Sequence, residues 1–322
     1  MAVAIPQAKI LEAVRKYPGN RVKVAVADID GVLRGKYLHK DKFFSAAEGG
    51  FGFCDVVFGW DSQDVCYDNT TITGWHKGFP DVLARIDLKT HRNVPWDDGV
   101  PFFLGEFVWQ KDGKEAPFPL CPRQLLKKVL ARAESMGLMP MAGMEFEWFN
   151  FSETPQTWAA KKGVDPEPIS PGMFGYSLLR ANAAQPYFAA LFNEMGAFGV
   201  PIEGLHTETG PGVYEVAILF SDALEAADRA VLFKSGAKEI ASRFDIMPSF
   251  TVSFNEENGS AVLAKTATSD PWGLVNTTAK TVKNIKSITQ LPLTGAAGTM
   301  LFTVVALLVA GAGVTIAIKS RQ

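Results

Sequence analysis

The chain has 322 residues, of which 47% are hydrophobic, so it is long enough for two domains with a sizeable core. Its formal net charge is −2, which gives no electrostatic basis for binding nucleic acid. The three cysteines are Cys54, Cys66 and Cys121, which are widely spaced and form no CxxC pair. Neither a disulfide framework nor a zinc site is therefore expected, and the thiols suit a reducing compartment.

Residues 1 to about 115 are expected to form one small α+β domain. Residues 22–38 show the pattern of a β-hairpin, with its turn at Asp30-Gly31. Residues 49–68 are rich in glycine and aromatic side chains without a clear hydrophobic period, which predicts a long loop with a short strand. The remaining predicted elements are a helix over 5–17 and strands over 80–87, 95–96 and 102–109.

A second domain, of the α/β type, is expected over residues 116–254. Its best-defined element is an amphipathic helix over 222–244, with Ser221 as the N-cap. Residues 152–177 are polar and rich in proline and glycine, which predicts a long excursion of the kind that usually carries function or is disordered. The other predicted elements are helices starting at Pro122 and over 186–198, strands over 139–149 and 246–254, and a β-hairpin over 200–219.

Two of these strand patterns carry carboxylates within otherwise apolar runs. Glu145 and Glu147 are two residues apart, so both side chains leave the same face of a strand. Gly210-Pro211-Gly212 is a turn signal between two strand-like arms, one carrying Glu208 and the other Glu215. Four carboxylates on one half-buried surface would repel each other, and Mg²⁺ or Mn²⁺, which accept oxygen ligands, would relieve that repulsion. Each segment alone has a simpler interpretation, namely the solvated face of an edge strand or an ordinary turn.

The motifs themselves are Glu-Phe-Glu-Trp-Phe at 145–149 and His-Thr-Glu-Thr-Gly-Pro-Gly-Val-Tyr-Glu at 206–215. Together they resemble the metal-binding strands of the glutamine synthetase family. Asp28-Ile29-Asp30-Gly31 is similar to the opening hairpin of the small N-terminal domain of that family. The resemblance covers about residues 20–250. It implies an α+β fold in which a β-grasp-like N-terminal domain precedes part of a glutamine-synthetase-type α/β catalytic domain.

This resemblance implies a role for each acidic residue. Glu147, Glu208 and Glu215 resemble the ligands of one metal site, where the glutamate carboxylate would be engaged. Glu145 resembles a ligand of a second metal site on the phosphoryl side, and Asp61 is the candidate for an aspartate that contributes to the ammonium site. The implied reaction joins ammonia or an amine to the γ-carboxylate of glutamate, with ATP as cosubstrate and Mg²⁺ or Mn²⁺ as cofactor, in a homo-oligomer.

The chain also departs from the family pattern. Val213 stands where the family usually has glutamine, which leaves the specificity for the amine or the acid open. His206 lies two residues before Glu208 on the same strand face; it could support a metal ligand, but a structural role is favoured. The histidines, the phosphate- and glutamate-holding arginines and the further metal-binding glutamate of the family do not follow Thr251. The nucleotide site is therefore expected to be incomplete, and the chain to be inactive or metal-binding only.

A different pattern begins after the catalytic part. Residues 255–290 are rich in Thr, Ala, Asn, Ser and Lys without a sustained hydrophobic period, which predicts a linker or residual strands. Then come Leu291-Pro292-Leu293-Thr294-Gly295, an uncharged and mostly apolar run over 296–318, and a short basic end. The run is long enough to cross a bilayer as a helix. Residues 291–322 resemble the LPxTG cell-wall sorting signal of Gram-positive surface proteins and pilins, which implies cleavage by a sortase between Thr294 and Gly295.

The ligase-like part of the chain and its C-terminal tail imply different locations in the cell. The first residues lack the basic segment and apolar core of a signal peptide, so the ligase part is expected in the cytoplasm, where ATP is present. The tail instead predicts the membrane and the cell wall. A junction near 250–255, natural or artefactual, would explain the conflict. The competing functions are therefore an ATP-dependent ligase, a non-enzymatic surface protein anchored by a sortase, and a pseudoenzyme that binds metal or amino acid.

Overall fold

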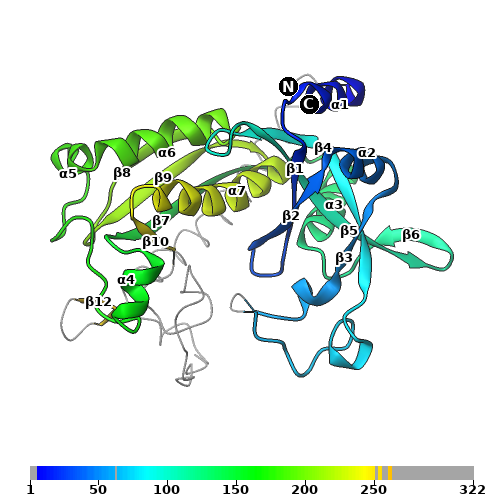
Figure 1. Ribbon diagram of the computed structural model, residues 1–322, viewed down its shortest axis with the longest axis horizontal. Helices are drawn as coiled ribbons and strands as arrows, with labels where there is room; N and C mark the ends of the chain where they lie inside the picture. The colour runs from blue at the N-terminus through cyan, green and yellow to red at the C-terminus, as the bar shows by residue number, and fades with distance from the viewer. Residues whose placement is uncertain (1–5, 62–63, 251–252, 256–259, 263–322) are drawn as a thin grey trace. The chain divides into compact units, whose positions relative to one another are not determined.

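The computed structural model describes residues 6–61, 64–250, 253–255 and 260–262 (Figure 1). Helices and strands alternate along them in a mixed α and β fold with two main sheets. Within these ranges, no helix is both long and apolar enough to cross a membrane. The sorting signal and the apolar run over 296–318 lie outside the described residues.

The first sheet combines one parallel strand pair with antiparallel pairs. Its strands follow the order β2-β1-β5-β4-β3, and β6 also pairs with β5. Strands β1 and β5 run parallel, whereas the other neighbours are antiparallel. The elements are α1 (Gln7–Lys16), β1 (Arg21–Ala27), β2 (Leu33–His39), α2 (Lys40–Gly49), β3 (Phe51–Cys54), the 3₁₀ turns η1 (Asp55–Phe58) and η2 (Trp75–Lys77), β4 (Asp81–Val94), β5 (Val100–Lys111) and β6 (Lys114–Pro117).

One face of the first sheet forms a hydrophobic core with α1 and α2. Val22, Val24 and Val26 alternate along β1 and are at most 1% exposed. They belong to one cluster with Val14 of α1 and Phe43 of α2. Burying a side chain of this size stabilises the fold by about 1.5–3 kcal/mol, so the alternation along β1 fixes which face turns inward.

The predicted turn at Asp30-Gly31 is confirmed, and Asp28 organises it. The Asp28 side chain is 1% exposed, and its Oδ1 accepts hydrogen bonds from the backbone N–H groups of Asp30 (2.9 Å) and Val32 (2.8 Å). Its Oδ2 accepts one from Arg34 Nε at 2.9 Å. Gly31 has a φ of +69°, which glycine adopts without steric cost.

The second sheet is antiparallel throughout, with the strand order β10-β7-β9-β8. Helices α6 and α7 pack against one of its faces. The elements are α3 (Pro122–Ser135), β7 (Met141–Phe151), α4 (Pro155–Ala160), α5 (Leu178–Ala183), α6 (Gln185–Ala197), β8 (Ile202–Thr207), β9 (Val213–Asp222), α7 (Ala223–Ser242) and β10 (Met247–Ser249), followed by a separate strand pair of β11 (Ser253–Asn255) and β12 (Ser260–Val262).

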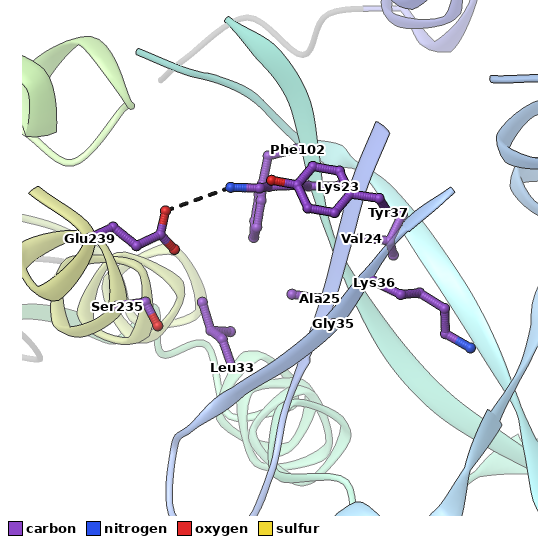
Figure 2. A pocket seen from close by; sticks show the side chains of 10 residues that line it. All are labelled: Lys23, Val24, Ala25, Leu33, Gly35, Lys36, Tyr37, Phe102, Ser235 and Glu239. Carbon is purple, nitrogen blue, oxygen red and sulfur yellow. Dashed lines mark ion pairs between the residues drawn. The ribbon is translucent and has the colours of Figure 1, made fainter. Parts of the chain in front are cut away.

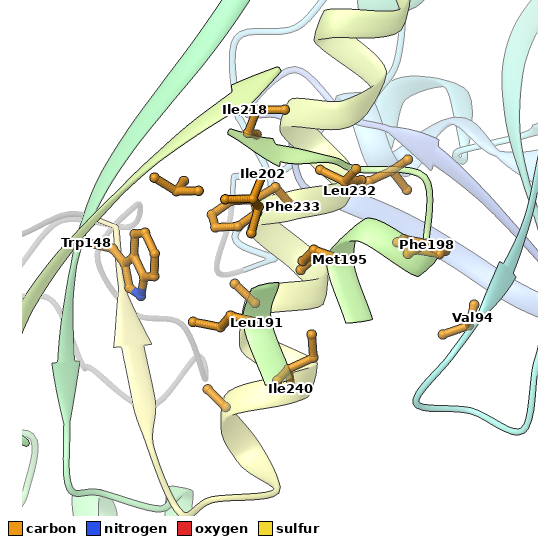
Figure 3. Close-up of a cluster of buried hydrophobic side chains, with 14 of the residues drawn as sticks. Val94, Trp148, Leu191, Met195, Phe198, Ile202, Ile218, Leu232, Phe233 and Ile240 are labelled. Carbon is orange, nitrogen blue, oxygen red and sulfur yellow. The ribbon is translucent and has the colours of Figure 1, made fainter. Parts of the chain in front are cut away.

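The side chains between the second sheet and its helices form the larger core. Figure 3 shows Trp148 of β7 pointing into the same space as Leu191 of α6 and Phe233 of α7. These three side chains are at most 1% exposed, as are Tyr214 and Val216 of β9. Because side chains alternate along a strand, the residues between them, including Glu145, Glu147 and Glu215, leave the opposite face.

A buried ion pair joins the first sheet to α7. Arg123 of α3 is 8% exposed and donates two hydrogen bonds to Asp228 of α7, at 2.9 and 3.0 Å. Its guanidinium also contacts Glu106 of β5 (2.7 Å) and Asp87 of β4 (2.9 Å). Burial opposes the charge of Arg123, but the hydrogen bonds and charge of Asp228, together with the charges of Asp87 and Glu106, outweigh it and raise the pKa of Arg123. The arginine therefore stays charged and holds α7, which supports the second sheet, against β4 and β5.

Several sequence-based boundaries were wrong. The N-cap of α7 is Asp222, whose Oδ1 accepts a hydrogen bond from the backbone of Glu225 at 3.1 Å, and not Ser221. Residues 95–96, expected to be a strand, lie in the turn between β4 and β5. The strand expected over 246–254 is confined to β10 and part of β11. Helix α2 was not predicted at all, and the excursion over 152–177 contains α4.

Candidate metal centre

Three strands of the second sheet place one residue each in a single row across its exposed face. Glu147 of β7 is the cross-strand partner of Glu215 of β9, and Glu215 is in turn the partner of His206 of β8. Directly paired residues project from the same face of a sheet, so these three side chains are neighbours. Glu147 is exposed, whereas Glu215 and His206 are half-buried.

Glu208 joins this row from the end of β8. Its backbone N–H donates to the Val213 carbonyl oxygen at 2.9 Å, which extends the pairing of β8 and β9 by one residue. His206 lies between the two carboxylates: its Nδ1 is 3.8 Å from Glu208 Oε2, and its Nε2 is 3.7 Å from Glu215 Oε2. One ligand atom from each of His206, Glu208 and Glu215 lies within 4.8 Å of the other two.

The two carboxylates of this cluster have opposite pKa shifts. A hydrogen bond from the backbone N–H of Thr209 is the main reason why the pKa of Glu208 lies below its usual value. Burial raises the pKa of Glu215, and the carboxylates of Glu147, Glu208 and Glu145 raise it further, while His206 opposes them. The row thus carries more negative charge than His206 can balance, which is the electrostatic environment that favours a bound cation.

The turn that brings Glu208 and Glu215 together is fixed by Asn150. Asn150 is completely buried, and its Oδ1 accepts hydrogen bonds from Trp148 Nε1 (2.9 Å) and the Tyr187 hydroxyl (2.8 Å). Its Nδ2 and its backbone N–H both donate to the Gly212 carbonyl oxygen, at 3.0 and 2.9 Å. Gly212 has a φ of +70°, and a Cβ there would lie 2.5 Å from the Asn150 carbonyl oxygen, so only glycine fits.

A second contact fixes the ring of His206. The Tyr176 ring stacks on the His206 ring, with centroids 4.3 Å apart and planes 22° apart. The Thr207 carbonyl oxygen accepts a hydrogen bond from the Tyr176 backbone at 2.6 Å, and Thr207 Oγ1 accepts one from the Ser177 backbone at 2.8 Å. Tyr176 has a φ of +55°, an uncommon conformation for a tyrosine. The excursion over 152–177 therefore ends in a segment that lies directly against the row of Glu147, Glu215 and His206.

The other residues predicted for the site lie further away along the chain or the sheet. Glu145 is in the adjacent row of the same face, where its cross-strand partner is Ala217. Asp61 belongs to the loop beside the first sheet, where its Oδ1 accepts a hydrogen bond from the Val65 backbone at 3.0 Å. Its carbonyl oxygen accepts one from Arg34. Val213 is 3% exposed and packs in an apolar cluster with Phe149 and Phe151, so it borders the row without opening onto it.

The sequence favoured a structural role for His206, and the structure places its ring between Glu208 and Glu215. Part of this arrangement can be read from the sequence, because His206 and Glu208 alternate along one strand face in the same way as Glu145 and Glu147. The pairing that places His206 beside Glu215 depends on strand register, which that alternation does not reveal.

The second sheet carries carboxylates and a histidine on one face and packs against helices α6 and α7 with its other face. This arrangement defines a candidate metal-dependent protein of mixed α and β structure. Residues 119–265 match the model of the glutamine synthetase catalytic domain, and residues 286–322 match the LPXTG cell wall anchor motif. The chain therefore carries a region that matches the glutamine synthetase catalytic domain, followed by a region that matches the anchor motif. The family match extends to residue 265, beyond the limit near 250 expected from the motifs.

Known proteins share this region at high and moderate identity. Type-1 glutamine synthetase 2 of Dictyostelium discoideum is 54% identical over 229 residues, which are 71% of this chain and 43% of that protein. Glutamate–isopropylamine ligase of a Pseudomonas species is 32% identical over 243 residues, 75% of this chain and 52% of that protein. The crystal structure of a novel glutamine synthase homolog superposes with a TM-score of 0.61 at 24% identity, covering 76% of this chain and 53% of that one. The chain thus spans about half the length of the relatives it matches.

Proposed function

We propose that the described residues form the metal-binding part of a glutamine-synthetase-type ligase, with one divalent cation, Mg²⁺ or Mn²⁺, held by Glu147, Glu208 and Glu215. The observation that carries this proposal is the row of Glu147, Glu215 and His206 across β7, β9 and β8, with Glu208 beside it. Glu145, one row further, would contribute to a second cation.

The donor set fits such an ion. Carboxylate oxygens are the preferred protein ligands of Mg²⁺, and an imidazole nitrogen next to them is compatible with Mn²⁺. The raised pKa of Glu215 reflects burial and uncompensated neighbouring carboxylates, and a divalent cation would supply the missing charge. In ligases of this type the cation offsets the charge on the transferring phosphoryl group. The chain's own contribution is to position the carboxylates, through the Asn150 network and the stack of Tyr176 on His206.

The reaction that this site supports best is the ATP-dependent ligation of ammonia or an amine to the γ-carboxylate of glutamate. The names of the relatives support this choice, since one is a glutamine synthetase and another ligates isopropylamine to glutamate. Asp61 is proposed to contribute to the ammonium site, and the protein is proposed to act as a homo-oligomer. Titration of the full chain with Mn²⁺, followed by the electron paramagnetic resonance of the free ion, tests the metal site: one saturable site supports it, and an unchanged signal contradicts it.

The domain boundaries expected from sequence belong to the same proposal. The mixed order of the first sheet, with helix α2 following the first hairpin, supports a β-grasp-like domain over residues 1–115. The sheet of β7 to β10 supports a partial catalytic domain over 116–254. Residues 255–290 would form a linker, and residues 291–322 the sorting signal with a transmembrane helix over 296–318.

The anchor match supports a second proposal, that a sortase processes the tail. Residues 286–322 match the cell wall anchor motif and include Leu291, Pro292, Thr294 and Gly295. Cleavage is proposed between Thr294 and Gly295, with attachment to the cell wall. Incubation of the full chain with a purified sortase and an amine acceptor tests this: mass spectrometry should find a product ending at Thr294, and an intact chain would contradict it.

A further inference from the structure

A cavity lies between the hairpin of β1 and β2 and helix α7 (Figure 2). It is separate from the proposed metal-binding row of Glu147, Glu215 and His206. Its volume is about 200 Å³. At roughly 30 Å³ for each water-sized group, this volume corresponds to about seven such groups, which is the size range of a small organic molecule. Ala25, Leu33 and Phe102 form an apolar wall. The recess continues past Phe102 towards the apolar side chains of Val94 and Leu232.

Two opposite charges face each other across the cavity without closing into a tight pair. Lys23 Nζ of β1 is 3.6 Å from Glu239 Oε2 of α7, beyond the 2.7–2.9 Å of a charge-assisted hydrogen bond. Figure 2 shows the two side chains approaching from opposite walls. Each is held back by another partner, because Lys23 Nζ contacts Asp97 Oδ2 at 2.9 Å and Glu239 Oε2 accepts a hydrogen bond from Trp96 Nε1 at 2.6 Å.

A hydroxyl group on the same helix adds a free hydrogen-bonding position. Ser235, one turn before Glu239, borders the cavity and is half-buried. Its Oγ has no hydrogen-bond partner among the residues that the structure describes. Lys36 also borders the cavity, but its ammonium contacts the Gly52 carbonyl oxygen at 3.2 Å and points away in Figure 2. The Lys23 ammonium and the Glu239 carboxylate, although each has a partner, thus border the cavity together with the Ser235 hydroxyl, where a ligand can contact all three.

We propose that this cavity binds a small zwitterionic molecule with an apolar side group, of the size of valine. The ligand carboxylate would contact Lys23 and Ser235, and its ammonium group would contact Glu239. A zwitterion offers a carboxylate to Lys23 and an ammonium group to Glu239 at the same time. An anion alone would leave Glu239 without an opposite charge from the ligand, and a cation alone would do the same to Lys23. The branched side group would lie on Leu33 and Phe102. This site is independent of the metal-binding row.

Equilibrium dialysis of the full chain with radiolabelled L-valine, in the presence of EDTA, tests the proposal. Saturable binding of one valine per chain is expected, and L-glutamate should not displace it. Isobutylamine and 3-methylbutanoate, which each lack one of the two charges of valine, should compete at least tenfold more weakly than unlabelled valine. No saturable binding, or equal competition by either single ion, would overturn the assignment.

Two variants locate the site. Ser235→Leu fills the cavity without removing a hydrogen bond of the described structure, and it should abolish valine binding. Glu239→Gln removes the charge opposite the ligand ammonium and should weaken binding at least tenfold, while Glu134→Gln on the exposed surface of α3 should leave it unchanged. Retention of Mn²⁺ binding by each variant shows that it is folded. Unchanged valine binding by a folded Ser235→Leu variant would place the ligand elsewhere and refute the proposal.

Discussion

Glu147 and Glu215 are direct cross-strand partners, two carboxylates side by side on neighbouring antiparallel strands. Like charges in this arrangement destabilise a sheet, typically by some tenths of a kcal/mol up to about 1 kcal/mol. His206 on the other side of Glu215 offsets part of this repulsion, but Glu208 and Glu145 add to it. A sheet that keeps this pair has a local cost in stability, and binding of a cation would reverse that cost.

Glu215→Gln should therefore separate function from stability. Mn²⁺ binding by the full chain should be lost, since the central member of the row no longer carries a charge. The free energy of unfolding without metal should stay the same or rise by up to about 1 kcal/mol, because the repulsion with Glu147 is removed. Urea unfolding in EDTA and Mn²⁺ titration measure the two quantities. Glu203→Gln, an exposed change on β8, is the matched control, and unaltered Mn²⁺ binding by Glu215→Gln would refute the site.

His206→Ala distinguishes a metal-supporting histidine from a structural one. If His206 contacts or orients the ion, its loss should weaken Mn²⁺ binding by roughly 10- to 100-fold, as removal of supporting groups around metal ligands does. Tyr176→Leu removes only the stacked ring and should give a smaller loss of affinity. An affinity within twofold of the parent chain for His206→Ala would assign the histidine a purely structural role.

Asn150→Ala should be among the most destabilising single changes in the second sheet. It leaves the buried donors of Trp148 and Tyr187 without their acceptor, and each such orphaned group costs about 1–3 kcal/mol. The expected loss in unfolding free energy, from urea denaturation, is about 3 kcal/mol. Tyr187→Phe should cost only about 1 kcal/mol, and the double variant less than the sum of the two. Additive effects would show that the two side chains do not act through one network.

Asp97 should give the first sheet an acid-sensitive component of stability. Burial alone would raise the pKa of Asp97, but hydrogen bonds from Tyr37, Lys23 and Arg21 outweigh it and lower the pKa to about 2, from 3.8. The folded state thus binds this proton less readily than the unfolded state, so the stabilisation is complete above about pH 4 and is lost as the pH falls towards 2. Its size is on the order of 2 kcal/mol. Asp97→Asn should be less stable than the parent chain at pH 7, and the difference should shrink by pH 3; a difference independent of pH would contradict this.

The 322-residue chain by itself should not release phosphate from ATP with glutamate and Mg²⁺ at a useful rate. Phosphoryl transfer depends on positioning and charge neutralisation, and loss of even one preorganised donor costs roughly 10²- to 10³-fold. After Thr251 the only arginine is Arg321, and no histidine follows His206. Purified chain would be compared with a full-length glutamine synthetase under the same conditions. Turnover within about tenfold of that enzyme would show that the essential groups are present.

The sequence by itself determined the features that depend on near neighbours in the chain. The spacing of Glu145 and Glu147 placed both side chains on one strand face, because side chains alternate along a strand. Gly210-Pro211-Gly212 indicated a turn between the arms carrying Glu208 and Glu215, because glycine and proline favour the backbone conformations of turns. The same local rules indicated the hairpin at Asp30-Gly31. They placed the N-cap of α7 one residue early, at Ser221, since Ser and Asp are both good caps.

Only the tertiary structure decided which residues meet. The row of Glu147, Glu215 and His206 depends on the register of three strands, and irregularities near Gly143 and Glu203 shift that register by amounts that no local pattern encodes. Asn150 lies one residue beyond the strand predicted over 139–149, and its role became apparent only when Tyr187 and Gly212, 37 and 62 residues away, met it in the core. Pairing over such distances is set by the burial of whole faces against α6 and α7, which is a property of the packed chain and not of any segment.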